Sequence, residues 1–304
     1  MYKNHKSQKG LTLIEILVAM ALSAIVMTMA ISIFISSKIN YQHTKTLAQN
    51  DVKTLNVQKL LYDAIENAGL SCKYGTQTQQ YINRTTENLN DLSFIANKSA
   101  VRFGNIASIG SYMNHTLSAR SPGLVYQEDS DYIMVKNEYL ATSLESKPLS
   151  YTLNIKQPLD VTRNDYLAIC NNDQIDVVKA TASNDTGNQI KLAAAPLGDY
   201  NRGDYVGKLG INIFYIADTG EKDDLGQTVY GFFLYSKNGS GLANTQLLVD
   251  DVSDLKISFV NTYRNKLRWK HLYKNVDLQN VDAKALRITF KIKGRKFEKV
   301  ILLK

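Results

Sequence analysis

The N-terminal segment constrains this chain most, because it contains a long apolar run with a single acid at its start. The stretch Ile16–Ser37 carries no charged residue, and Glu15 stands directly before it. As a helix, this stretch rises about 33 Å, enough to cross a hydrocarbon core of about 30 Å. Lysines precede it at positions 3, 6 and 9, so the positive-inside rule predicts that residues 1–10 stay cytoplasmic and that the rest is exported.

Two ordinary explanations of this segment leave Glu15 unexplained. A secretory signal cut near Ala19-Met20-Ala21 or Leu22-Ser23-Ala24 would have Glu15 inside its apolar core and would leave the apolar residues Ile25 to Ile35 as a new N-terminus. A plain single-pass anchor explains only the length. A carboxylate in a membrane helix costs about 2.5–3.5 kcal/mol at the centre and less near the end, so it needs a partner.

The stretch Lys9-Gly10-Leu11-Thr12-Leu13-Ile14-Glu15 closely resembles the class III leader of type IV pilins and pseudopilins. The resemblance implies that prepilin peptidase cuts after Gly10. Leu11 would then become the N-methylated first residue, where the family usually has Phe. In the family, the carboxylate that corresponds to Glu15 pairs with the new N-terminal amine of a neighbouring subunit, so Glu15 is the expected subunit-assembly contact.

The apolar helix is expected to continue past the membrane. Between Asn40 and Ala68 there is neither proline nor glycine, and Gly69 is the expected end of a helix that begins near Leu11. Apolar residues recur in its second half at roughly helical spacing, with charged residues between them. These residues predict the face that packs on a globular domain: Val52, Leu55, Tyr62, Ile65 and Ala68.

From residue 71 onward the pattern changes to short runs rich in Ile, Val, Phe and Tyr, bounded by Asn, Asp, Gly and Ser. This predicts a mainly antiparallel β domain that ends in a hairpin with a turn at Gly294-Arg295. The stretch 83–120 is weakly patterned and is expected to be rich in loops. The expected strands are "DYIMVKNEYL", "SYTLNI", "DYLAIC", "QIDVVKA", "INIFYIA", "VYGFFLY", "LKISFV" and "ALRITFKIKG".

Blocks such as "AIENAGLSCKYG" and "DYLAICNNDQIDVVKAT" resemble the PilW-type minor pilins, which are longer than major pilins. J-type pseudopilins of type II secretion share the leader and a C-terminal pattern that includes a tryptophan, here Trp269, and are the alternative. Both families imply other minor pilins, a major pilin or pseudopilin, prepilin peptidase and inner-membrane assembly machinery as partners. A single-pass periplasmic sensor or enzyme is the second alternative.

Cys72 and Cys170 are the only cysteines. Because an exported domain meets an oxidising compartment, and because both lie in blocks that carry paired cysteines in the PilW family, the resemblance implies a disulfide between them. Two separate buried thiols are the alternative.

Catalytic and metal chemistry are not indicated. The histidines are few and lie far apart, and no HExxH, GxSxG or Walker A pattern occurs, so we expect no enzyme, no cofactor and no metal site. The acidic stretch 217–224 is expected to be a turn, and the acidic stretch 249–254 is expected to be a turn or an edge that faces a partner. The basic cluster Arg264 to Lys274, with Tyr263, Trp269 and Tyr273, is expected to be a solvated strand face rather than a nucleic-acid site.

The sequence therefore predicts an α+β, pilin-like fold. Its expected parts are a leader peptide (1–10), the membrane half of the helix (11–37), its amphipathic half (38–70) and an exported β-rich domain (71–304). The expected location is the bacterial inner membrane with the globular domain in the periplasm, followed by the pilus.

Overall fold

The computed structural model describes residues 13–70, 72, 80–85, 99–109, 125–184, 186–237, 244–263, 266–271, 275–278, 281 and 283–303. It contains two compact units, residues 1–52 and 53–304, of which the second is called the head. The elements are α1 (Leu13–Glu66), β1 (Gln80–Asn83), β2 (Val101–Asn105), η1 (Ile106–Ser108), β3 (Asp131–Ser143), β4 (Thr152–Asn154), β5 (Tyr166–Cys170), β6 (Gln174–Ser183), β7 (Gln189–Leu192), β8 (Tyr205–Lys222), β9 (Thr228–Lys237), β10 (Asn244–Asp250), β11 (Val252–Tyr263), β12 (Lys266–Lys270), β13 (Val276–Asp277), β14 (Ala283–Ile292) and β15 (Arg295–Leu302).

Helix α1 ends where the sequence predicts. The Asn67 amide donates the last helical hydrogen bond to the Asp63 carbonyl over 3.0 Å. Gly69 then has a φ of +122°, which favours glycine, and its amide donates to the Lys136 carbonyl on β3. The chain therefore leaves the helix and joins the sheet within a few residues.

The predicted packing face of α1 is largely wrong. Val52, Leu55 and Tyr62 are exposed, with 65% of Leu55 accessible, whereas Ile65 is buried and Ala68 is half-buried against the core. The buried stripe consists of Thr54, Val57, Leu61 and Ile65. Both sets recur every three or four residues, so periodicity fits either face, and only the position of the sheets selects one.

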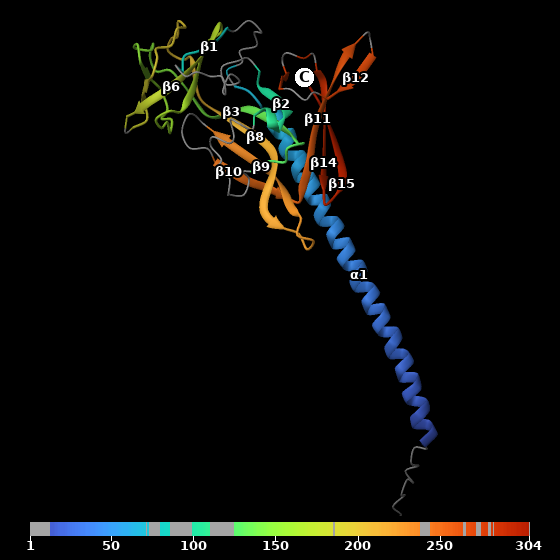
Figure 1. The fold of residues 1–304 in the computed structure, drawn as a ribbon. Coiled ribbons are helices and arrows are strands. Elements are labelled where there is room, and N and C mark those ends of the chain that lie inside the picture. The colour runs from blue at the N-terminus through green and yellow to red at the C-terminus, as the bar shows by residue number, and fades with distance from the viewer. Residues whose placement is uncertain are drawn as a thin grey trace, which may run out of the picture. The chain divides into compact units, whose positions relative to one another are not determined.

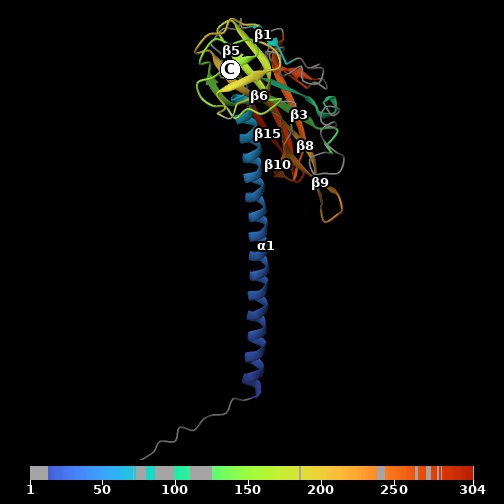
Figure 2. The same cartoon turned by 90° about the vertical axis from the view of Figure 1, so that its left-hand side faces the viewer.

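The head contains two sheets, and nearly all their neighbouring strands are antiparallel. The larger has the order β13-β2-β3-β8-β5-β6-β7-β4 (Figure 1). In addition, β9 pairs with β8, β10 pairs with β9, and β1 pairs in parallel with β6. The smaller has the order β12-β11-β14-β15. The end of the β8–β9 hairpin extends beyond its neighbouring strands in both Figure 1 and Figure 2.

Each of the predicted strand segments lies in or overlaps a strand, so the α+β prediction is confirmed. The C-terminal hairpin is also present, with Lys293 and Gly294 at positive φ in its turn. In the stretch expected to be rich in loops, the described part adds β2 and η1, because Val101 and Phe103 alternate into the core. The rest of that stretch is mostly outside the described residues.

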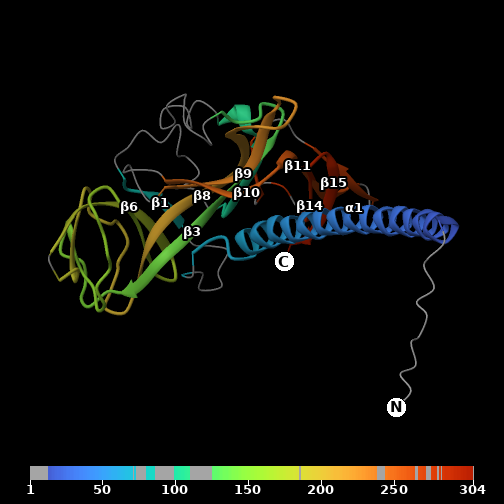
Figure 3. The same ribbon diagram turned by 90° about the horizontal axis from the view of Figure 1, so that it is seen from below.

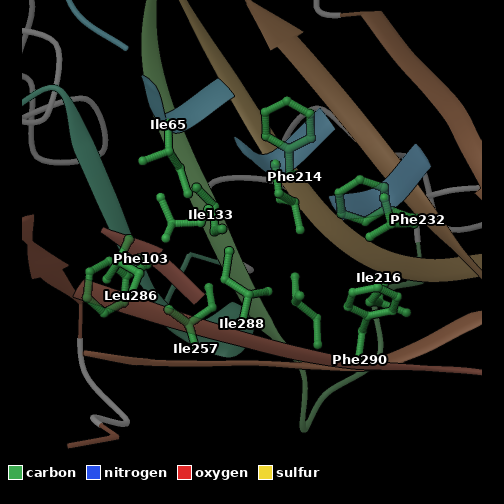
Figure 4. Close-up of a cluster of buried hydrophobic side chains, with 14 of the residues drawn as sticks. Ile65, Phe103, Ile133, Phe214, Ile216, Phe232, Ile257, Leu286, Ile288 and Phe290 are labelled. Carbon is green, nitrogen blue, oxygen red and sulfur yellow. The ribbon is translucent and has the colours of Figure 1, made fainter. Parts of the chain in front are cut away.

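Three apolar clusters fill the head. One joins Val57 and Leu61 of α1 with side chains of both sheets, among them Phe214, Phe232 and Phe290 (Figure 4). A second contains Cys72 and Cys170 together with buried tyrosines of β3, β5 and β8. The third lies among β4 to β8, and Figure 3 shows β6 at the opposite end of the head from β14 and β15.

Candidate assembly site

Glu15 lies in the first turn of α1. The side chains that line the helix surface beside it are Ile14, Val18, Ala19 and Leu22, all apolar. Its carboxylate is thus presented on an exposed apolar helix end, which is the arrangement that demands a cationic partner once water is withdrawn. The predicted cleavage and methylation residues, Gly10 and Leu11, lie outside the described residues.

The surface of α1 from residue 13 to residue 49 is exposed throughout, although most of its first half is apolar. Phe34, for example, is 68% accessible. A continuous apolar surface of this length requires lipid or other helices to cover it. By length and composition, α1 contains a segment that could cross a membrane.

Three hydroxyl side chains of this segment bond to their own helix. Ser23 donates to the Ala19 carbonyl over 2.7 Å, and Thr28 donates to the Ile25 carbonyl over 2.8 Å. Ser32 likewise donates one turn back. Because these hydroxyl groups donate to backbone carbonyls of their own helix, they can enter a hydrocarbon layer without leaving a donor unsatisfied.

Residues 5–31 match the family model of the prokaryotic N-terminal methylation motif. The N-terminal segment of this chain is therefore type IV pilin-like. The match contains Gly10, Leu11 and Glu15, and so places all three within one leader motif. No curated protein and no solved structure matches the chain.

The pilin-like motif implies processing by prepilin peptidase and membrane association with pilus machinery. It agrees with the uncovered apolar surface of α1, since processing in this class precedes the apolar stretch and retains the helix. The fold described above adds what the motif does not contain, a long helix followed by a β-rich head.

The two cysteines form a disulfide in the structure. Cys72, just after the helix, bonds to Cys170 at the end of β5, and their Cα atoms are 6.1 Å apart. Both side chains are buried, at 1% and 0% accessibility. The bond fixes the chain that leaves α1 to the larger sheet.

The acidic stretch 249–254 forms the tight turn between β10 and β11 and contacts the helix. Nζ of Lys53 lies 2.6 Å from Oδ2 of Asp251 and 3.0 Å from Oδ2 of Asp250. Burial opposes the charged form of Lys53, but the hydrogen bonds to Asp251 and Asp250 outweigh it and raise the Lys53 pKa above its usual value. Sequence analysis predicted the turn but not its partner, because Lys53 is distant in sequence.

The prediction that the acidic stretch 217–224 is a turn is wrong for residues 217–222, which belong to β8, and holds only for Asp223 and Asp224 at the exposed tip of the β8–β9 hairpin. One oxygen of Asp223 accepts the amides of Leu225 and Gln227, which closes the turn. Asp218 accepts the Gly220 amide. These carboxylates shape the hairpin, and Leu225 projects from it with 82% of its surface accessible.

Only part of the basic and aromatic cluster is described. Arg268, Trp269 and Lys270 lie on β12, while Arg264, Tyr273 and Lys274 lie outside the described residues, as do the side chains of Tyr263 and Lys266. The guanidinium of Arg287 lies 4.5 Å from the Trp269 ring centre. The cation on Trp269 thus comes from β14, which local sequence spacing does not reveal.

A buried carboxylate at the junction of the two sheets was not predicted. Asp131 begins β3 and is 1% accessible, and its Oδ2 accepts the Ile257 amide from β11 over 2.7 Å. Burial raises the pKa of Asp131 to about 6, although the Ile257 amide and the nearby His271 and Lys256 lower it in part. Nδ1 of His271 is 3.6 Å from the same oxygen.

Proposed function

We propose that this chain is a minor pilin of PilW type, which prepilin peptidase cuts between Gly10 and Leu11 and which joins other minor pilins in the inner membrane to initiate pilus assembly. The observation that carries the proposal is the position of Glu15, which follows Gly10 by five residues and lies at the exposed apolar start of α1. We further propose that the head is exported to the periplasm, that it ends near the pilus tip, and that it has no enzymatic activity.

The proposed role of Glu15 follows from electrostatics. Cleavage would create an α-amino group at Leu11, close to Glu15 in sequence, and N-methylation would preserve its positive charge at neutral pH. A carboxylate and an amine at the helix end are each costly in lipid but stabilise one another when paired. If the amine comes from a neighbouring subunit, the pair sets the axial stagger between adjacent helices.

The test is intact mass measurement and N-terminal sequencing of the membrane-extracted protein, from cells with and without prepilin peptidase. We expect a chain that begins at Leu11 only when the peptidase is present, with a mass increment of one methyl group if Leu11 is methylated. Retention of residues 1–10 in both strains would contradict the proposal and would favour a single-pass anchored sensor or enzyme.

A J-type pseudopilin of type II secretion is the alternative that the leader supports equally, since both classes share it. The Cys72–Cys170 disulfide and the length of 304 residues favour the PilW type, whose members are longer and carry paired cysteines in these blocks. Deleting the gene separates the two: loss of pili with normal secretion supports the pilin, and the reverse result supports the pseudopilin.

A further inference from the structure

The outer face of the smaller sheet carries one row of apolar residues beside polar ones such as Thr289, Lys291 and Glu298. Trp269, Val260, Ala285 and Leu302 pair in register across β12, β11, β14 and β15, so their side chains lie on one face. The opposite face holds the buried Ile288 and its neighbours. An apolar row therefore crosses the whole sheet on the side away from the core.

The two ends of this row are accessible and its centre is not: Trp269 is 39% exposed, whereas Val260 and Ala285 are buried. Leu302 is 77% exposed and Leu267, which neighbours Trp269 on the same face, is 69% exposed. Val300 lies beside Arg287 in the register and is also exposed. Large apolar side chains that gather in this way on a surface mark an interaction site more often than isolated ones do.

The same strands are strongly basic. All charged residues of β12, β14 and β15 are lysine or arginine except Glu298. Arg287 and Lys296 lie on the apolar side of the sheet, and Arg287 rests on the Trp269 ring. An apolar centre with cations around it fits a partner that presents an apolar side chain among carboxylates.

The β8–β9 hairpin of the same chain has that chemistry. Residues 220–227 are all exposed. Leu225 directly follows Asp223 and Asp224 in the tip, and Glu221 lies two residues before Asp223, near the end of β8. At 82% accessibility, Leu225 is the most exposed large apolar side chain among the described residues of the head. That accessibility also means that the tip is not folded back on the sheet of its own chain.

We propose that the hairpin tip around Leu225 in one copy of this chain docks on the outer face of the smaller sheet in a second copy. Leu225 packs against Leu267 and Trp269, while Glu221 and Asp224 face Arg287 and Lys296. Because the two surfaces differ, the contact is head-to-tail and repeats from copy to copy unless a ring closes. The contact involves the head alone, so it does not depend on cleavage at Gly10.

The test uses the full chain in nonionic detergent and measures self-association by sedimentation velocity at about 0.1 M and about 1 M salt, where the screening length falls from about 10 Å to about 3 Å. We expect association at the lower salt concentration that weakens at the higher one. Lys296→Glu and Arg287→Glu should each lower the association constant about tenfold or more. Arg202→Glu, in an exposed turn at the other end of the head, is the matched control and should leave it unchanged.

A charge exchange makes the assignment specific. The tip variant Glu221→Lys/Asp224→Lys and the face variant Arg287→Glu/Lys296→Glu should each fail to self-associate, and mixing the two should restore binding. Leu225→Ser should weaken association, whereas Leu149→Ser, at another exposed leucine (68% accessible), should not. Thermal unfolding of each variant verifies that the head remains folded.

Several results would overturn the proposal. A wild-type chain that sediments as a single protomer at the lower salt concentration would do so. Association that all variants retain at both salt concentrations would show that the apolar helices, not the heads, hold the copies together. Failure of the mixed variants to associate would exclude the tip as the partner, and binding of a single-stranded oligonucleotide to the face without self-association would assign the surface to nucleic acid instead.

Discussion

Lys53 of α1 contacts Asp251 in the β10–β11 turn, with 2.6 Å between Nζ and Oδ2, and the two side chains are 22% and 23% accessible. Asp251 has a φ of +60°, which aspartate and asparagine tolerate better than other residues with a Cβ atom. The ion pair therefore connects the helix to the β10–β11 turn at Lys53, the first residue of the head. The backbone conformation of that turn also favours an aspartate at position 251.

Asp251→Asn keeps that backbone preference and removes the charge. Because the pair is partly buried, we expect the free energy of unfolding of the head to fall by about 1–2 kcal/mol at neutral pH. The matched control is Asp199→Asn, which breaks the pair with Lys147, 2.5 Å long but with side chains 66% and 78% accessible, and should change stability by about 0.5 kcal/mol or less. Denaturant unfolding measures both; equal effects would contradict the role given to Lys53.

Leu61→Ala and Leu55→Ala test which face of α1 is packed. Leu61 is 1% accessible and Leu55 is 65% accessible, although the two are separated by less than two helical turns. We expect Leu61→Ala to lower the free energy of unfolding by about 2–5 kcal/mol and Leu55→Ala to leave it within about 0.5 kcal/mol. A larger loss of unfolding free energy for Leu55→Ala than for Leu61→Ala would show that the face predicted from periodicity is the packed one.

Removing the disulfide should destabilise the head strongly. Cys72 and Cys170 are 98 residues apart in sequence, so the bond restricts a large part of the unfolded chain. In the chain-entropy model the double variant Cys72→Ala/Cys170→Ala loses about 4–5 kcal/mol of unfolding free energy, and less if native strain intervenes. Chemical reduction of the wild-type protein should give a similar loss and should have no effect on the double variant.

Asp131 should make the stability of the head depend on pH. Its pKa is raised from 3.8 to about 6 in the fold, so protonated Asp131 is favoured in the native state and its contribution is fully present below about pH 4. That contribution, at most about 3 kcal/mol, is lost as pH rises through 6. Asp131→Asn should remove this part of the pH profile, measured by denaturant unfolding between pH 4 and pH 8. An unchanged profile would contradict the assignment of this pH dependence to Asp131.

Glu15→Gln should reduce assembly into filaments and leave membrane insertion intact. The substitution keeps the size of the side chain but removes the charge that pairs with an α-amino group, so we expect about a tenfold or greater loss of the protein from sheared filaments. Ser23→Ala is the control, since Ser23 bonds within its own helix and its removal should have no such effect. Filament recovery equal to wild type in Glu15→Gln would contradict the assembly role.

Sequence reasoning worked where the signal is local. The end of α1 near Gly69, the strand at "ALRITFKIKG" and the C-terminal hairpin each depend on neighbouring residues, and the structure contains all three. The choice between two faces of α1 failed, because Leu55 and Leu61 both fit a helical period. The stacking of Arg287 on Trp269 could not be predicted either, since β11 lies between β12 and β14 in the sheet.

The sequence by itself determined the apolar helix with Glu15 at its start, the leader motif around Gly10 and the order of strand-forming segments, because chain-local composition and spacing specify each of them. Only the tertiary structure decided that Lys53 contacts Asp251, that Asp131 is buried between the sheets, and that an apolar row crosses the outer face of the smaller sheet. Those features depend on which strands pair and in which register, and pairing joins residues that are far apart in the chain.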